Sequence, residues 1–123
     1  MKTIKIDDWN EVPNNFTGIA KHVRGDKYWY LNGKFHREGD PAVECVNGDK
    51  HWYLNGKHHR EDGPAIVCVN GYKSWWLNDN RHRIDGPAIE WIDGIKEYWI
   101  NDKRVTKEAQ EVLYAMYKLK GLL

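Results

Sequence analysis

Residues 52–65 read Trp-Tyr-Leu-Asn-Gly-Lys-His-His-Arg-Glu-Asp-Gly-Pro-Ala, and this stretch decides the fold. It opens with bulky residues that suit a short β-strand. Asn55-Gly56 then supplies the two positions of positive φ that a type I′ hairpin turn requires. Pro64 has no N–H to give to a ladder, so it marks a bend or a sheet edge. The stretch therefore predicts a hairpin followed by a kinked return arm.

The same stretch recurs along the chain with a period of 23 residues, and positions 41–63 match positions 64–86 at 14 of 23 places. A fixed register of this kind is typical of a stacked repeat array. We therefore predict an all-β fold, an antiparallel meander or solenoid of four β-hairpin repeats of about 23 residues. The rows that keep the step are Trp29/Trp52/Trp75/Tyr98, Leu31/Leu54/Leu77/Ile100, Asn32/Asn55/Asn78/Asn101, Gly25/Gly48/Gly71/Gly94, His36/His59/His82, Arg37/Arg60/Arg83 and Pro41/Pro64/Pro87.

Each predicted repeat contains a second turn. Asn47-Gly48 and its equivalents Asn70-Gly71 and Asp93-Gly94 also fit the type I′ pattern. Between the two turns we expect one short strand over residues 50–54.

The two ends of the chain differ from the repeats. We predict a single domain over 1–123, with an N-terminal cap at 1–17, the repeats at 18–109 and a C-terminal capping α-helix at 106–121. Thr106 suits the start of this helix. An apolar stripe with helical spacing is expected to cover the last hairpin, whose edge would otherwise be open. The stripe consists of Ala109, Val112, Leu113, Met116 and either Leu119 or Lys120.

Composition excludes several classes of protein. Lys+Arg is 19 and Asp+Glu is 18, so the formal net charge of +1 argues against binding a long polyanion. No run approaches the roughly 18 apolar residues of a membrane span, and the N-terminus lacks a signal-peptide pattern, so a cytoplasmic location is expected. Cys45 and Cys68 are expected to be half-buried fillers. No catalytic or metal-ligand spacing occurs, so we expect no enzyme activity, no cofactor and no metal.

The period also assigns side chains to faces of the sheet, because residues two apart on a strand share a face. The rows that begin with Trp29 and Leu31 are predicted to form the core. The row Tyr30/Tyr53/Trp76/Trp99 then points to the opposite face, where it either stacks on a partner or is covered by the return arms.

Rows that vary between repeats are the predicted contact rows, because packing does not hold their residue type constant. They carry Tyr, Phe, His and Arg, which are residue types of protein interfaces. The candidate partner-binding residues are Tyr28, His51, Phe35, His58, Arg81, Arg104 and Tyr72.

The repeated His-Arg pairs have two interpretations. The leading one is structural: each arginine contacts a turn Asp or a backbone carbonyl, and each histidine bonds across its hairpin. The alternative is a small-nucleotide or nucleic-acid site that uses Arg37, Arg60 and Arg83 together with Tyr30, Tyr53, Trp76 and Trp99.

The quoted stretch resembles the MORN repeat, which has W-x-N-G-K-x-H and a 23-residue period, and the resemblance covers residues 18–109. Residues 60–64, Arg-Glu-Asp-Gly-Pro, depart from the family's usual H-G-x-G. The HREDGPA spelling resembles a variant found in small proteins of large bacteriophages and giant viruses.

The resemblance implies a non-enzymatic scaffold that binds a protein partner. In a phage, that partner would be a host protein such as a defence factor, bound and inhibited in the host cytoplasm. A membrane-surface scaffold is a further alternative, because some relatives bind phospholipid. Homo-oligomers are left open.

Overall fold

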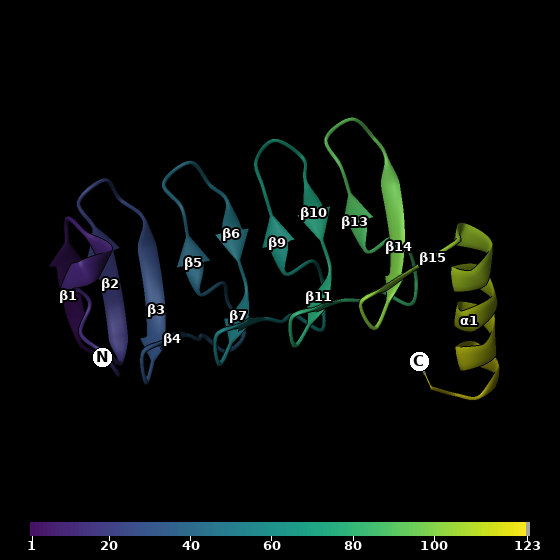
Figure 1. Cartoon of the computed structure of the whole chain (residues 1–123), viewed down its shortest axis with the longest axis horizontal. Helices are drawn as coiled ribbons and strands as arrows, with labels where there is room; N and C mark the ends of the chain where they lie inside the picture. The colour runs from purple at the N-terminus through teal and green to yellow at the C-terminus, as the bar shows by residue number, and fades with distance from the viewer. Residues whose placement is uncertain (123) are drawn as a thin grey trace.

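A computed structural model describes residues 1–122. The protein is mostly β, with an open sheet that runs from β1 to β15 and one helix beyond it (Figure 1). The strands are β1 Thr3–Ile6, β2 Gly18–His22, β3 Lys27–Leu31, β4 Lys34–Phe35, β5 Val43–Glu44, β6 Lys50–His51, β7 Tyr53–Leu54, β8 Lys57–His58, β9 Ile66–Val67, β10 Lys73–Ser74, β11 Trp76–Leu77, β12 Asn80–Arg81, β13 Ile89–Glu90, β14 Lys96–Ile100 and β15 Lys103–Val105. A 3-10 turn, η1, spans Trp9–Glu11, and the helix α1 spans Lys107–Leu119.

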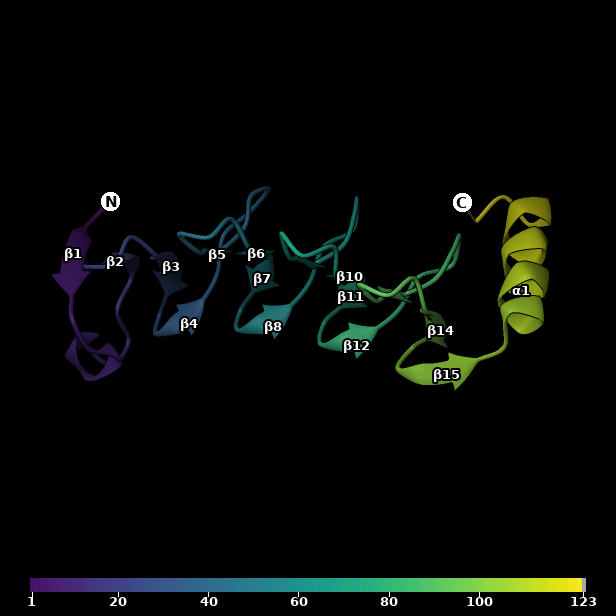
Figure 2. The same ribbon diagram turned by 90° about the horizontal axis from the view of Figure 1, so that it is seen from above.

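The main sheet follows chain order, as a meander does. Its order is β1-β2-β3-β5-β6-β9-β10-β13-β14-β15, and every pairing is antiparallel except that of β1 with β2. The short strands β4, β8 and β12 pair locally with β3, β7 and β11. Seen from above, β4, β8, β12 and β15 lie to one side of the main sheet (Figure 2). The part of each segment that holds these short strands, which lies at the bottom of the view in Figure 1, therefore turns out of the plane of the main sheet.

The two predicted sets of type I′ turns have different outcomes. Asn55 and Gly56 adopt φ values of 50° and 78°, which confirms the type I′ prediction there. At Asn47-Gly48 only Gly48 is left-handed, with φ of 102°, so the type I′ prediction was wrong. The N–H of Cys45 donates to the Asp49 carbonyl at 2.9 Å, which closes a three-residue loop with glycine at the left-handed position.

The strand predicted over residues 50–54 is divided at Trp52 into β6 and β7. The Trp52 N–H donates to the Ala65 carbonyl at 2.7 Å, and the Trp52 carbonyl accepts from the His59 N–H at 3.1 Å. Trp75 repeats this arrangement with Ala88 and His82. Ala65 and Ala88, whose carbonyls accept these hydrogen bonds, are fully buried. The backbone bends at the tryptophan because its two hydrogen bonds go to the return arm and to the hairpin.

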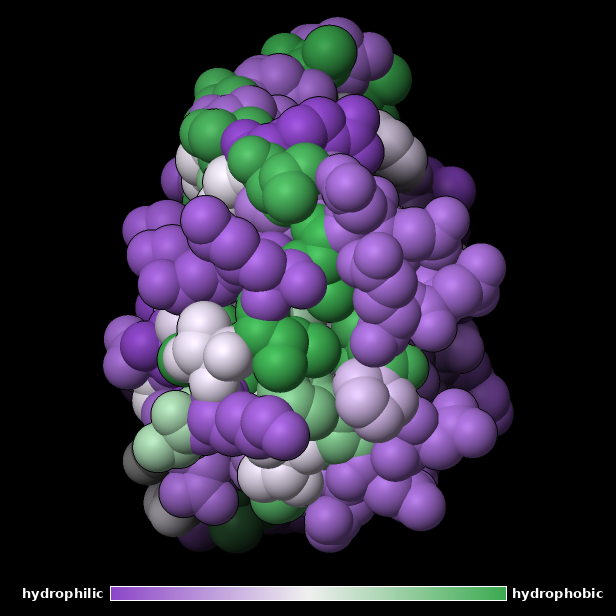
Figure 3. All heavy atoms as spheres, turned by 90° about the vertical axis from the view of Figure 1, so that its left-hand side faces the viewer, coloured by the Kyte–Doolittle hydropathy of each residue, from purple (hydrophilic) through white to green (hydrophobic). Residues whose placement is uncertain are grey.

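The most buried cluster lies on the Tyr28 face, near the N-terminal end. Ile6, Phe16, Ala20, Tyr28 and Val43 form it, with partly buried neighbours at Tyr30 and Phe35. The prediction placed the core on the other face, along the row of Trp29, and was wrong: that row is only half-buried. The cap supplies Ile6 and Phe16 to the Tyr28 face, which removes that face from water. At this end of the molecule hydrophobic side chains gather centrally within a hydrophilic surround (Figure 3).

The C-terminal helix lies where the sequence predicts it, but it presents a different side to the sheet. The Thr106 hydroxyl accepts from the Ala109 N–H at 3.1 Å and caps the helix. Gln110 is buried, and its side-chain amide donates to the Ile84 carbonyl. Val112, Met116 and Leu119 are exposed, so the expectation that their stripe covers the last hairpin was wrong for these residues.

No helix within residues 1–122 combines the length and apolarity needed to cross a bilayer.

Candidate binding surfaces

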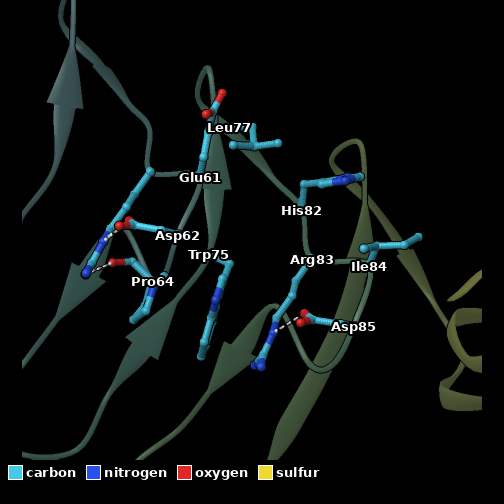
Figure 4. A pocket seen from close by; sticks show the side chains of 11 residues that line it. Glu61, Asp62, Pro64, Trp75, Leu77, His82, Arg83, Ile84 and Asp85 are labelled. Carbon is cyan, nitrogen blue, oxygen red and sulfur yellow. Dashed lines mark hydrogen bonds and ion pairs between the residues drawn. The ribbon is translucent and has the colours of Figure 1, made fainter. Parts of the chain in front are cut away.

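Each repeated arginine is held by its own segment. The Arg60 guanidinium stacks on Trp52, 3.8 Å from the ring centroid, and donates to the Asp62 carboxylate at 2.9 Å and to the Pro64 carbonyl at 3.1 Å. Arg83 has the same three kinds of contact with Trp75, Asp85 and Pro87. Figure 4 shows Arg83 between Trp75 and Asp85. Each guanidinium therefore has its charge matched by a carboxylate of its own segment and one face covered by an indole, which disfavours a phosphate there.

The first arginine varies this theme. Arg37 stacks on Trp29 at 3.9 Å and donates to the Pro41 carbonyl at 3.1 Å. Its carboxylate partners are Glu44 at 3.2 Å and Asp40 at 3.8 Å. We call Arg37, Arg60 and Arg83, with their stacked tryptophans Trp29, Trp52 and Trp75, the Trp–Arg row.

The repeated histidines tie each segment to the next one. His59 Nδ1 accepts the backbone N–H of Asn78 at 3.1 Å, and His82 Nδ1 accepts that of Asn101 at 2.9 Å. His36 does the same for Asn55 at 2.9 Å. The acceptor lies 19 residues before its donor in all three cases. These bonds tie successive turns together, so the imidazoles have a structural role, but the expectation that each histidine bonds across its own hairpin was wrong, because its partner lies in the next segment.

A cavity of about 590 Å³ opens between two successive members of the Trp–Arg row (Figure 4). Its charged lining is Arg60 and Arg83 together with Glu61, Asp62 and Asp85. Because the carboxylates outnumber the guanidiniums and two of them are bonded to those guanidiniums, the cavity does not attract an anion. It holds no pairing of a nucleophile with a base.

The opposite side carries a continuous column of rings. The centroid of Phe35 lies 5.0 Å from that of Tyr30 and 5.2 Å from that of Tyr53. His58 lies 4.2 Å from Tyr53 and 5.4 Å from Trp76. We call the whole run the aromatic column: Tyr30, Phe35, Tyr53, His58, Trp76, Arg81 and Trp99.

The C-terminal end of the aromatic column combines indoles with arginines. Arg81 Cζ lies 3.6 Å from the ring centroid of Trp99 and 5.9 Å from that of Trp76, so the guanidinium bridges the two indoles. The Arg81 Nε also donates to the Asp102 carboxylate at 2.7 Å. Arg104 is exposed and lies opposite Trp99 in the β14–β15 register. The column thus changes from apolar rings near the cap to indoles flanked by arginines near α1.

The structure brings together most of the predicted partner-binding residues. Phe35, His58 and Arg81 belong to the aromatic column, and Arg104 lies beside its end. His51 lies 6.4 Å from Tyr53 in a stacked arrangement. Tyr28 also lies against the column, with its ring centroid 5.8 Å from that of Phe35, but it is buried under Trp9, with centroids 4.3 Å apart. Tyr72 stands apart from this group and lies against Trp91.

The residues of the alternative nucleotide site are not brought together. Arg37, Arg60 and Arg83 stack on the tryptophans of the Trp–Arg row. Tyr30, Tyr53, Trp76 and Trp99 belong to the aromatic column on the other side. One small ligand therefore does not reach both sets.

Exposed apolar side chains lie in the β13–β14 loop, and two of them, Trp91 and Ile92, were missed by sequence reasoning. Trp91, Ile92 and Ile95 are 41%, 65% and 57% exposed. Earlier loops are linked by carboxylates: Asp26 accepts the Val46 N–H at 2.7 Å, and Asp49 accepts the Val69 N–H at 2.9 Å. The sequence contains a signal for this difference between the loops. At the positions equivalent to Asp26 and Asp49, the next two repeats have Tyr72 and Ile95, which have no carboxylate to link one loop to the next.

Three histidines, one of them in the aromatic column, have a lowered pKa. Burial lowers the pKa of His51, whose Nδ1 is buried with no hydrogen-bond partner among the described residues. Burial, and then the neighbouring His51, lower the pKa of His58. Burial also lowers the pKa of His82. If His51 and His58 were both protonated, two positive charges would lie on rings whose centroids are 6.0 Å apart.

We expect mild acid to destabilise the fold through these histidines. As pH falls from about 6.5, the ordinary histidine pKa, toward the lowered folded values, the unfolded chain binds more protons than the folded chain, so the free energy of unfolding decreases. Chemical denaturation at several pH values between 7 and 5 measures this slope. The double variant His51→Gln/His58→Gln should retain only the smaller slope due to His82. An equally steep slope in the variant would contradict the assignment.

Two carboxylates near the end of the aromatic column act in a separate, lower range of pH. Hydrogen bonds from Trp91 and Trp99 lower the pKa of Glu97, and Arg81 lowers that of Asp102. Their stabilising contribution is lost only as pH falls below about 4.5, through the lowered values.

Cys45 and Cys68 are half-buried free thiols in the described chain.

Comparison of the chain with protein-family models, with curated proteins and with solved structures finds no match.

Proposed function

We propose that this chain is a non-enzymatic protein-binding module, a MORN-like scaffold of four β-hairpin repeats that contacts its partner through the C-terminal part of the aromatic column. One observation carries this proposal: the repeated polar side chains are engaged within the chain. The guanidinium of Arg60 and the imidazole of His59 both have intramolecular partners. Recognition is therefore left to side chains that differ between repeats.

The composition of the column supports a protein partner. Trp and Arg are the residue types in which interface binding energy is concentrated. The indole N–H groups of Trp76 and Trp99 are bonded to Ser74 and Glu97, at 2.7 and 3.0 Å, which holds the rings in fixed orientations. Rings that are already ordered lose little entropy on binding.

The chemistry of the partner follows from the same residues. A complementary surface has apolar or aromatic groups for Trp76 and Trp99, and a carboxylate for the exposed Arg104. The resemblance to phage proteins leads us to propose a host protein, such as a defence factor, as the partner and its inhibition as the outcome.

Two variants on β15 test the proposal. Arg104 and Lys103 are neighbours on this strand and both are exposed, but successive residues of a strand point to opposite faces. Tagged wild-type protein and Lys103→Glu should retain the same stoichiometric protein from host lysate. Arg104→Glu should reduce its capture at least about tenfold, because a carboxylate then faces a carboxylate. Equal capture by both variants, or no specific protein with the wild type, would overturn the proposal.

The alternative hypothesis, that the chain binds a nucleotide, predicts a different result. Nucleotides added at low salt would then change the tryptophan fluorescence, and they would compete with the captured protein.

A further inference from the structure

We propose that a line of lysines on one face of the main sheet binds an acidic amphipathic helix of a partner protein. The lysines follow one continuous line of the register across the strands, and we call this line, with the residues between them, the lysine stripe. The inference is independent of the function proposed above, because Lys27 shares a face of β3 with Trp29, whereas Tyr30 of the aromatic column points to the opposite face. The lysines of the stripe are Lys5, Lys21, Lys27, Lys50, Lys73 and Lys96.

The lysine stripe carries positive charge that the chain does not match. None of the ion pairs formed within residues 1–122 contains a lysine. The stripe has two carboxylates of its own, Glu44 and Glu90. They are paired instead with Arg37 and Arg83, at 3.2 and 3.4 Å. The stripe is therefore open to carboxylates from outside the chain.

At two places the stripe brings lysines together with no carboxylate between them. Lys21 lies directly opposite Lys27. Farther along, Val67 is the single residue between Lys50 and Lys73. Like charges that face one another on a sheet lower its stability, and an anionic partner relieves this repulsion.

Aspartates that neighbour the stripe along the chain are used elsewhere. Asp26 precedes Lys27, but its carboxylate accepts the Tyr28 hydroxyl at 3.3 Å, on the other face of β3. Asp49, the equivalent residue one repeat later, accepts the Val69 N–H at 2.9 Å. These carboxylates do not neutralise the lysine stripe.

A row of exposed aliphatic side chains runs beside the lysine stripe, nearer the tips of the loops. Val23, Val46, Val69 and Ile92 recur at the repeat period and are 58%, 69%, 65% and 65% exposed. A Cβ on Gly48 would lie 2.7 Å from the Val69 side chain, so glycines fill the spaces between members of the row. Figure 1 shows the loops that carry this row in a line along one edge of the sheet. A partner that covers both rows needs carboxylates next to apolar groups.

The spacing of the lysines fits an α-helix laid across the strands. Lys50, Lys73 and Lys96 lie on every second strand of the sheet, which places them about 9.6 Å apart. Residues seven apart on a helix lie about 10.5 Å apart on the same side of it. A helix with one acidic residue and adjacent apolar residues in each heptad therefore matches three successive lysines and the aliphatic row beside them.

Other anionic partners fit the two rows less well. The aliphatic row offers no aromatic ring on which a nucleic-acid base could stack. An anionic bilayer lying along this face would also meet the Asp62 carboxylate, which is 87% exposed beside the Trp–Arg row and would repel it.

Fluorescence anisotropy of a labelled synthetic peptide tests the proposal. The probe is a helical peptide of three heptads with one glutamate and two flanking leucines in each, and its control has glutamine in place of glutamate. The wild-type protein should bind the glutamate peptide at least about tenfold more tightly than the glutamine peptide, and added NaCl should reduce the difference. Phosphatidylserine vesicles and an oligothymidylate, measured in parallel, should bind more weakly than the glutamate peptide.

The chain offers a matched pair of double variants with the same change in charge. Lys50→Gln/Lys73→Gln removes two lysines of the stripe, and Lys34→Gln/Lys57→Gln removes two exposed lysines of the short strands β4 and β8. The first variant should bind the glutamate peptide at least about threefold more weakly, and the second should bind it like the wild type. Exposed glutamines keep the fold, which circular dichroism verifies. Equal binding of the two peptides, equal loss in the two variants, or tighter binding of the vesicles or the oligothymidylate would overturn the proposal.

Discussion

Gly18→Ala is expected to lower the free energy of unfolding by about 3–5 kcal/mol. Gly18 is buried and has φ of 146°, a conformation that residues with a Cβ atom rarely adopt. A Cβ there would collide with the Lys2 carbonyl and would lie 2.9 Å from the Phe16 ring. The Lys2 carbonyl cannot move away freely, because it accepts the Ile19 N–H at 2.8 Å where β1 meets β2.

Gly39→Ala is the control for this variant. Gly39 also has a positive φ, 80°, but nothing lies within 4 Å of the position of its Cβ. The control should therefore lose only about 1 kcal/mol of stability, which is the backbone penalty alone. Urea denaturation monitored by tryptophan fluorescence compares the two. Equal losses would mean that the junction of β1 and β2 relaxes without cost.

The cap that Gly18 supports also explains why the core was assigned to the wrong face. The period correctly placed Trp29 and Tyr30 on opposite faces of β3. It could not tell which face the first 17 residues cover, because no repeat relates them to the rest. The contact of Phe16 with Tyr30, whose ring centroids are 5.8 Å apart, decides this, and it is a tertiary contact.

The aromatic column was within reach of the sequence. A two-residue turn at Asn55-Gly56 sets the register Leu54↔Lys57 and Tyr53↔His58, and the structure has this register. This register places each member of the row that begins with Tyr30 opposite a member of the row that begins with Phe35, so the two rows alternate along one column. The turn at Asn47-Gly48 was not predictable in the same way, because Asn-Gly serves both two-residue and three-residue loops.

The helix shows a different limit of sequence reasoning. Apolar spacing alone favours placing Val112 and Met116 against the sheet. The structure instead buries Gln110, because its amide satisfies the otherwise unpaired carbonyl of Ile84. Hydrophobic periodicity does not register this kind of polar requirement at the end of a sheet.

Arg60→Ala should destabilise the protein by about 2–3 kcal/mol, the second large effect that we expect. The substitution removes the stacking on Trp52 and leaves the Pro64 carbonyl without its donor. Arg60→Lys should recover less than half of the loss, since an ammonium cannot contact the ring, Asp62 and Pro64 in one plane. Arg24→Ala, in the exposed β2–β3 loop, is the control and should change stability by less than about 0.5 kcal/mol.

The same variants separate the structural interpretation of the Trp–Arg row from the ligand-binding one. If Arg60 acts within its own segment, Arg60→Ala lowers stability while the folded fraction binds its protein partner with unchanged affinity. If Arg60 belongs to an anion site, the variant folds nearly as well as the wild type and loses ligand affinity instead. The contacts of Arg60 favour the first result, because its guanidinium is already matched in charge by Asp62 and covered on one side by Trp52.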